Sequence, residues 1–251
     1  MTIINIPHSS TFIPEELLPQ YLLDKISLES ELLVMTDWYM DEMAPDDTET
    51  IQSICADVSR LVCDVERFRD DAEEPMNLVG MGAVYTRTSD GRRLSDITLR
   101  TREEILARFY DPYHQKFEAM TRKALLQHGQ CLIIDLHSFP SRPLPYEQDQ
   151  TLARPEICIG TDDFHTPELL VSLAETYFQE HGLDTVRNEP FSGTIVPASL
   201  YKRDSRVKSI MIEVRRDLYM DEATGSRKHD FKTIRHQISK FIEELNHQFV
   251  I

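Results

Sequence analysis

The sequence predicts an α/β fold in which helices cover a mainly parallel sheet. Short apolar segments alternate with longer segments whose apolar residues recur at helical spacing, a pattern typical of parallel sheets. Two of the short segments lead into a histidine, which would place both imidazoles at the carboxyl edge of the sheet, where open α/β sheets bind ligands. The chain of 251 residues can form one substantial core, so we expect a single domain over residues 1–251.

The order of these segments along the chain gives the expected elements. Strands are expected over residues 2–6, 49–56, 60–66, 131–134, 183–186 and 209–214. Helices are expected over residues 14–43, 101–128, 166–182 and 231–245. Residues 68–99 are rich in Asp, Glu, Gly and Arg, and contain one strand-like triplet at residues 84–86, so we expect an ordered flap that borders the functional site.

Composition excludes several classes of partner. The formal net charge is −16, and such a field repels phosphate backbones, so no nucleic acid is expected. No apolar stretch is long enough to span a membrane, and the N-terminus does not resemble a signal peptide, so we expect a cytoplasmic protein. The four cysteines occur singly and include no C-x-x-C pair, so any metal site must use histidine and carboxylate.

The strongest functional signal is the pair of strand-end histidines, His8 and His137. A catalytic zinc commonly takes two histidines and one carboxylate and leaves a position for water. Asp37 and Asp41 are candidate carboxylates one helical turn apart; one could bind the metal and the other could orient His8. Asp135 should point to the opposite face from its apolar neighbours, so we expect it to orient a ligand or cap a turn.

A second signal is Glu213, which interrupts an otherwise apolar strand. A buried carboxylate needs a partner or a raised pKa, and a raised pKa beside a metal would suit a general base. The alternative is a buried ion pair with Arg215 or Arg216.

Arginines flank the end of the expected strand at residues 60–66. Arg60 or Arg67 could bind a substrate carboxylate through two parallel hydrogen bonds, although ion pairs with nearby acids would compete. Asn188 and Gly193 belong to another strand-to-loop junction, where glycine would allow the backbone to approach a ligand.

These motifs, taken in order, resemble the N-formylglutamate amidohydrolase family over nearly the whole chain. The resemblance rests on residues 8–10, 36–41, 60–67, 135–138, 188–193 and 212–213. It implies a single-domain three-layer α/β/α fold of the phosphorylase/hydrolase-like type, with a mainly parallel mixed central sheet. It also implies zinc-dependent hydrolysis of the amide of an N-acyl amino acid, with N-formyl-L-glutamate giving formate and L-glutamate in histidine catabolism.

Carried over by position, the resemblance also implies roles for individual residues. His8, Asp37 and His137 would hold Zn²⁺, Glu213 would act as base and then acid, and Arg60 or Arg67 would bind the substrate carboxylate. Relatives often have Asp-x-Asn-Arg where this chain has Asp64 to Arg67 with Glu66 in the third place, and that glutamate could neutralise the arginine. Two other functions fit the same residues: a zinc carboxypeptidase-like hydrolase of a short peptide, and a non-catalytic acidic binding protein.

Overall fold

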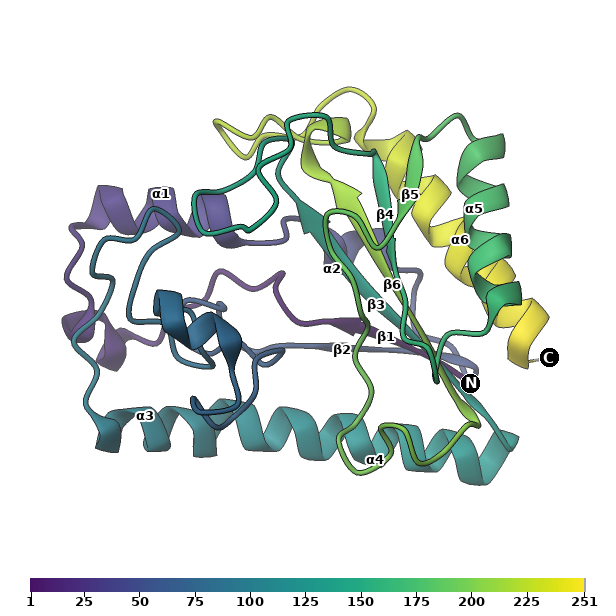
Figure 1. Cartoon of the computed structure of the whole chain (residues 1–251), viewed down its shortest axis with the longest axis horizontal. Helices are drawn as coiled ribbons and strands as arrows, with labels where there is room; N and C mark the ends of the chain where they lie inside the picture. The colour runs from purple at the N-terminus through teal and green to yellow at the C-terminus, as the bar shows by residue number, and fades with distance from the viewer. Residues whose placement is uncertain (251) are drawn as a thin grey trace.

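A six-stranded sheet in the order β2-β1-β3-β6-β4-β5 forms the centre of the molecule (Figure 1). The computed structural model describes residues 1–250. The strands are β1 (Thr2–Ile6), β2 (Ile51–Cys55), β3 (Cys131–Phe139), β4 (Ile157–Gly160), β5 (Thr185–Arg187) and β6 (Val207–Arg215). Neighbouring strands are parallel except for β4 and β6, which pair antiparallel. The predicted α/β class with a mainly parallel mixed sheet is therefore confirmed.

Helices cover the two faces of this sheet. Leu132 and Ile134 of β3 belong to the core under α2 (Met40–Met43), α5 (Glu168–Glu180) and α6 (Phe231–Val250). Ile133 packs instead with residues of α4 (Asp111–His128), which lies on the other side of the sheet (Figure 1). Because successive strand side chains point to opposite faces, Asp135 and His137 share the α4 side with Ile133.

The remaining helical segments are short. They are η1 (Glu15–Gln20), α1 (Lys25–Met35), η2 (Pro75–Val79), α3 (Leu99–Ile105), η3 (Leu106–Tyr110) and η4 (Arg216–Leu218). Across residues 1–250, none of the helices combines the length and apolar character needed to cross a membrane.

The prediction of one helix over residues 14–43 is wrong, because the segment is divided into η1, α1 and α2. The turn between α1 and α2 places Asp37 in the functional site. Asp24 starts α1 by accepting a hydrogen bond from Ser27 N at 2.7 Å, and Thr36 ends it in an extended conformation. Tyr39 then takes a left-handed conformation with φ of 67° before α2 begins. The turn between the two helices carries Asp37, whose backbone N–H donates to the carbonyl oxygen of His8 at 2.9 Å.

The predicted strand at residues 60–66 is also wrong. The backbone N–H groups of Val62 and Cys63 both donate to the Ser59 carbonyl, at 2.8 and 3.1 Å, so the segment turns instead of extending. Val62, Cys63 and Val65 are buried in the core beneath α4, and Leu61 is buried in a separate cluster with Tyr85, which explains why a turn has the composition of a strand. In the segment 68–99, residues 84–86 form no strand, and Tyr85 is fully buried.

Candidate metal centre and its cleft

The two histidines predicted to meet do so at the carboxyl edge of the sheet. His8 lies two residues beyond β1, and His137 lies in β3, which pairs with β1. Their ring centroids are 5.1 Å apart, and each residue is only 3% exposed. Two imidazoles from distant parts of the chain are thus near enough to share one ion.

Each imidazole is held at Nε2 by an aspartate. Asp64 Oδ1 lies 2.8 Å from His8 Nε2, and Asp135 Oδ1 lies 3.0 Å from His137 Nε2. Asn5, the register neighbour of Asp135 on β1, donates to the same oxygen of Asp135 at 2.8 Å. Carboxylates in this position fix the tautomer and direction of metal-binding histidines, so the other ring nitrogen of each histidine is left for a ligand.

Those other nitrogens converge on Asp37. Its Oδ2 lies 3.1 Å from His137 Nδ1 and 3.5 Å from His8 Nδ1, while Arg216 Nη2 donates to its Oδ1 at 2.8 Å. His8 Nδ1 is buried and has no hydrogen-bond partner among the described residues. Donor atoms that each lie about 2.0–2.2 Å from one tetrahedral zinc are about 3.3–3.6 Å apart. The two separations from Asp37 Oδ2 to the histidine nitrogens, 3.1 and 3.5 Å, are close to this spacing. Asp41 is exposed on α2, so of the two candidate aspartates only Asp37 reaches the centre.

The charge state of Asp37 suits a ligand. Burial opposes its ionisation, but the hydrogen bond from His137 and the charges of His8 and Arg216 outweigh burial and hold the pKa of Asp37 well below its usual value. Metal-binding carboxylates must be deprotonated, and Asp37 already is.

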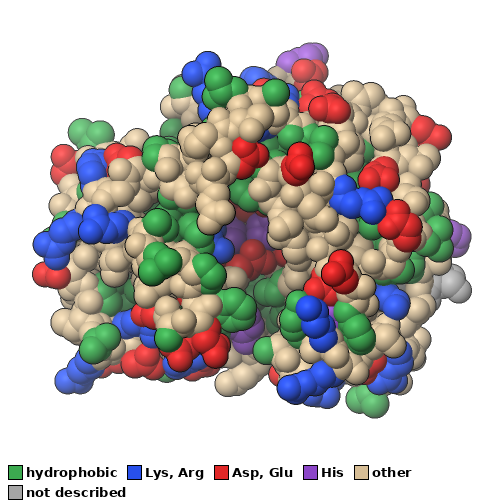
Figure 2. Space-filling view, in the orientation of Figure 1, with side chains coloured by type: hydrophobic (Ala, Val, Ile, Leu, Met, Phe, Trp, Pro, Cys, Tyr) green, Lys and Arg blue, Asp and Glu red, His purple; other side chains and the backbone are tan. Residues whose placement is uncertain are grey.

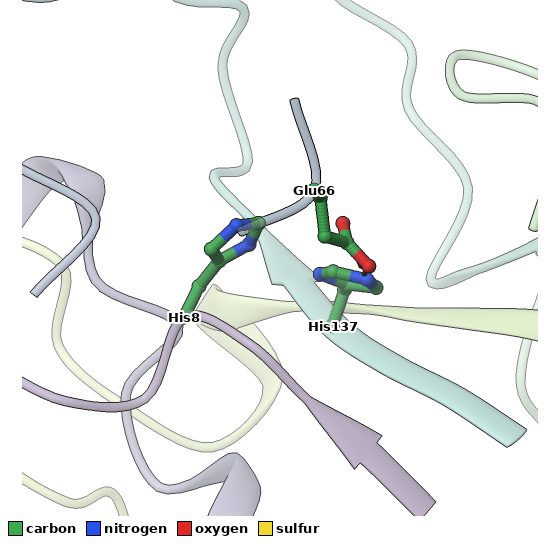
Figure 3. A group of neighbouring side chains, drawn as sticks. All are labelled: His8, Glu66 and His137. Carbon is green, nitrogen blue, oxygen red and sulfur yellow. Dashed lines mark ion pairs between the residues drawn. The ribbon is translucent and has the colours of Figure 1, made fainter. Parts of the chain in front are cut away.

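Glu66 is a second carboxylate beside the histidines (Figure 3). One potential ligand atom from each of His8, Glu66 and His137 lies within 4.8 Å of the others. Glu66 Oε2 approaches His137 Nε2 at 3.2 Å, the nitrogen already held by Asp135. Burial, together with the charge of Asp135, raises the pKa of Glu66, which favours its protonated form. Glu66 thus approaches a histidine nitrogen that Asp135 holds, whereas Asp37 approaches the other ring nitrogen of both histidines.

Glu213 faces the same site from β6. It is the register partner of His137, is 8% exposed, and its Oε2 is buried with no hydrogen-bond partner among residues 1–250. The alternative ion pairs are not formed, because Arg215 binds Asp217 at 2.7 Å and Arg216 binds Asp37. Burial raises the pKa of Glu213 to about 7, the range that suits a general base.

The raised pKa predicts a pH-dependent stability difference between the wild-type protein and Glu213→Gln, both kept metal-free with chelator. Folding penalises the charged carboxylate, so wild-type stability relative to the variant should fall as pH rises from about 4.5 to about 7, by up to about 1.4 kcal/mol per pH unit. Urea unfolding at several pH values measures this difference. Parallel stability profiles for the two proteins would contradict the burial of an ionisable group at this position.

A cleft of about 890 Å³ opens over these residues (Figure 2). Arg67 lines it, and its Nε is buried without a hydrogen-bond partner among the described residues, 3.6 Å from Asp64 Oδ2. Arg60 is more fully occupied: its Nη2 donates to Asp64 Oδ2 at 2.8 Å and its Nε donates to the Tyr85 hydroxyl oxygen at 3.2 Å. Glu66 accepts from Asn5 at 3.0 Å and forms no ion pair with Arg67 among the described residues, so it does not occupy that guanidinium.

The two remaining predicted substrate residues are placed differently. Gly193 lines the cleft. Asn188 does not, because its amide binds Thr161 through both atoms: Oδ1 accepts from the backbone N–H at 2.9 Å and Nδ2 donates to Oγ1 at 2.8 Å.

Sequence reasoning missed two residues that hold the centre together. Asp64 fixes His8, and Arg216 fixes Asp37 while also donating to the Ser138 carbonyl at 3.1 Å. Arg216 immediately follows β6. A cation at the carboxyl end of a strand is the sequence feature that could have indicated its place in the site. The sequence predicts only a possible ion pair of Arg216 with Glu213.

Most of the chain matches the model of a known protein family. The family model described as N-formylglutamate amidohydrolase matches residues 1–220. The chain belongs to the N-formylglutamate amidohydrolase family.

The solved structure of N-formylglutamate amidohydrolase from Ralstonia eutropha JMP134 matches this family member with a TM-score of 0.87 at 22% identity, over 99% of this chain and 93% of that one. A gene product of Agrobacterium tumefaciens matches with a TM-score of 0.66 at 17% identity, over 99% of this chain and 88% of that one. These likenesses show a shared fold. No curated protein sequence matches the chain.

Proposed function

We propose that this amidohydrolase uses zinc to hydrolyse the amide bond of an N-acyl amino acid, with N-formyl-L-glutamate as the reference substrate. The observation that carries the proposal is the convergence of His8 Nδ1 and His137 Nδ1 on Asp37 Oδ2, beside an unpaired Glu213. His8, Asp37 and His137 would hold the ion. Bound there, zinc would polarise the scissile carbonyl and make water a better nucleophile.

Glu213 supplies the proton transfers. Its unpaired Oε2 accepts a proton from the attacking water, and the same carboxyl then donates that proton to the nitrogen of the leaving amine. A pKa near 7 lets one group do both, because neither protonation state is strongly disfavoured at neutral pH.

Arg67 supplies the binding of the substrate carboxylate. The chain carries a net charge of −16, which opposes an anionic substrate, so binding requires a local cation. Arg67 lines the cleft, and apart from its Asp64 contact at 3.6 Å its guanidinium has no acidic partner among the described residues. A guanidinium in that state can bind a carboxylate through two parallel hydrogen bonds.

Replacing Arg67 with alanine should therefore raise KM for N-formyl-L-glutamate by about 10–100-fold and change kcat much less, because a charge-assisted hydrogen bond contributes about 1.5–3 kcal/mol. Steady-state kinetics of the zinc-loaded protein, with release of glutamate as the readout, measures the effect. Arg69→Ala is the matched control, since Arg69 is bound by Glu103 and Asp111 at 3.1 and 2.9 Å. Equal effects of the two substitutions would remove the substrate role from Arg67, and failure of the zinc-loaded wild type to hydrolyse any N-acyl amino acid would overturn the proposed function.

A further inference from the structure

The cleft continues beyond the metal centre into an apolar region on the side away from Arg67. This region, here called the acyl wall, consists of Phe191, Ile195, Val196, Ala198, Tyr201 and Met211, all of which line the cleft. The contacts separate the two sides: Arg67 lies 3.6 Å from Asp64, the residue that holds His8. Ile195 of the acyl wall instead donates to Asp135, the residue that holds His137. The metal centre on β1 and β3 lies between the two sides. Figure 2 shows the hollow between the two halves of the molecule, with histidine and acidic side chains at its floor.

The acyl wall is fixed to the sheet and to the centre. Ser209 Oγ on β6 donates to the Ile195 carbonyl at 2.8 Å, and the Ile195 N–H donates to Asp135 Oδ2 at 3.2 Å. Asp135 is the residue that holds His137, so the acyl wall is tied to an oriented imidazole. A Cβ added at Gly160 of β4 would lie 2.3 Å from the Gly193 carbonyl oxygen, which shows how closely this loop packs on the strand.

The chemistry of the acyl wall does not match a formyl group. The carbonyl carbon of a formyl group carries only hydrogen, so a formyl substrate anchored by Arg67 has no atom that extends past the centre. Clefts of several hundred Å³ hold ligands of drug size. Apolar side chains that line such a cleft contribute to the free energy of binding only when the ligand covers them and removes them from water. The apolar composition of the acyl wall matches a hydrocarbon chain on the carbonyl carbon.

Resting on the proposed function, we propose that the preferred substrates are N-acyl amino acids whose acyl group is an aliphatic chain of several carbons, which lies along the acyl wall while Arg67 holds the amino acid carboxylate. Water adds to the carbonyl carbon, the C–N bond breaks, and the products are a fatty acid and the free amino acid, whose nitrogen receives the proton. No other reactant is needed.

A series of N-formyl-, N-acetyl-, N-butanoyl- and N-hexanoyl-L-glutamate tests the proposal on the zinc-loaded protein. We expect kcat/KM to rise about threefold to fourfold for each methylene that the acyl wall covers. Ala198→Phe, which fills the acyl wall, should flatten or reverse the rise. Ala107→Phe is the matched control, because Ala107 is exposed on η3 and does not line the cleft.

The outcomes separate the two proposals. A flat series, or a wild-type preference for the formyl compound, overturns the acyl preference and leaves N-acyl amino acid hydrolysis standing. Hydrolysis of none of the four compounds overturns the proposed function itself. A rise that persists in Ala198→Phe would place the chain elsewhere in the cleft and also overturn the assignment of the acyl wall. The wild-type series decides the preference even if the variant fails to fold.

Discussion

Glu213→Gln is expected to lower kcat by about 10²–10⁴-fold while leaving the zinc content unchanged, because the amide keeps the shape of the side chain but cannot accept the proton of the attacking water. Glu213 is not one of the three proposed ligands, and its Oε2 has no hydrogen-bond partner among the described residues, so few protein contacts are lost. Stopped assays of formate and glutamate release, together with metal analysis of the same samples, measure both quantities.

The control for this substitution is Glu180→Gln, an exposed glutamate on α5. It should retain wild-type kcat and wild-type zinc. Survival of activity in Glu213→Gln on every N-acyl amino acid that the wild type cleaves would show that another group takes the proton. Loss of zinc from this variant would instead make Glu213 part of the metal site.

Asp37→Asn is expected to weaken zinc binding by more than about 100-fold. Removal of a residue that only hydrogen-bonds to a metal ligand typically costs roughly 10–100-fold in affinity, and Asp37 is proposed as a ligand itself. Asp37 Oδ2 is the oxygen on which the two histidine nitrogens converge, and an amide is a far poorer zinc ligand than a carboxylate. The substitution also leaves Arg216 as a buried cation with a weakened partner, so the fold of the variant is checked by circular dichroism. Zinc titration against a competing chelator measures the affinity.

Two variants accompany Asp37→Asn. Glu66→Gln should keep zinc affinity close to wild type, because Glu66 approaches the nitrogen of His137 that Asp135 already holds. Asp41→Asn should have no effect, because Asp41 is exposed on α2. If Glu66→Gln loses zinc and Asp37→Asn keeps it, the carboxylate of the site is Glu66.

The sequence was sufficient to predict the features that follow from strand periodicity. His8 follows the apolar strand β1, and His137 lies within the apolar strand β3. Because Asn5 of β1 pairs in parallel with Asp135 of β3, both histidines lie at the carboxyl edge of the sheet. The polarity of Glu213 in an apolar strand predicted its burial near this edge, which the structure confirms.

Features that depend on turns and on side-chain direction could not be predicted in the same way. The buried turn at residues 60–66 has the apolar composition of a strand, because both are surrounded by core. The contacts of Asp64 with His8 and of Arg216 with Asp37 join residues 56 and 179 positions apart, and no local pattern records them. Periodicity also does not tell which ring nitrogen of a histidine faces the cleft.

The zinc content of the purified wild-type protein, after removal of metal by chelator and addition of zinc, decides whether His8 and His137 share one metal ion. We expect about one zinc per chain, lost in His8→Ala and in His137→Ala, because a mononuclear site needs both imidazoles. A content below about one tenth of an equivalent that added zinc does not restore would contradict this expectation, since a catalytic zinc site of this donor set binds the ion stably.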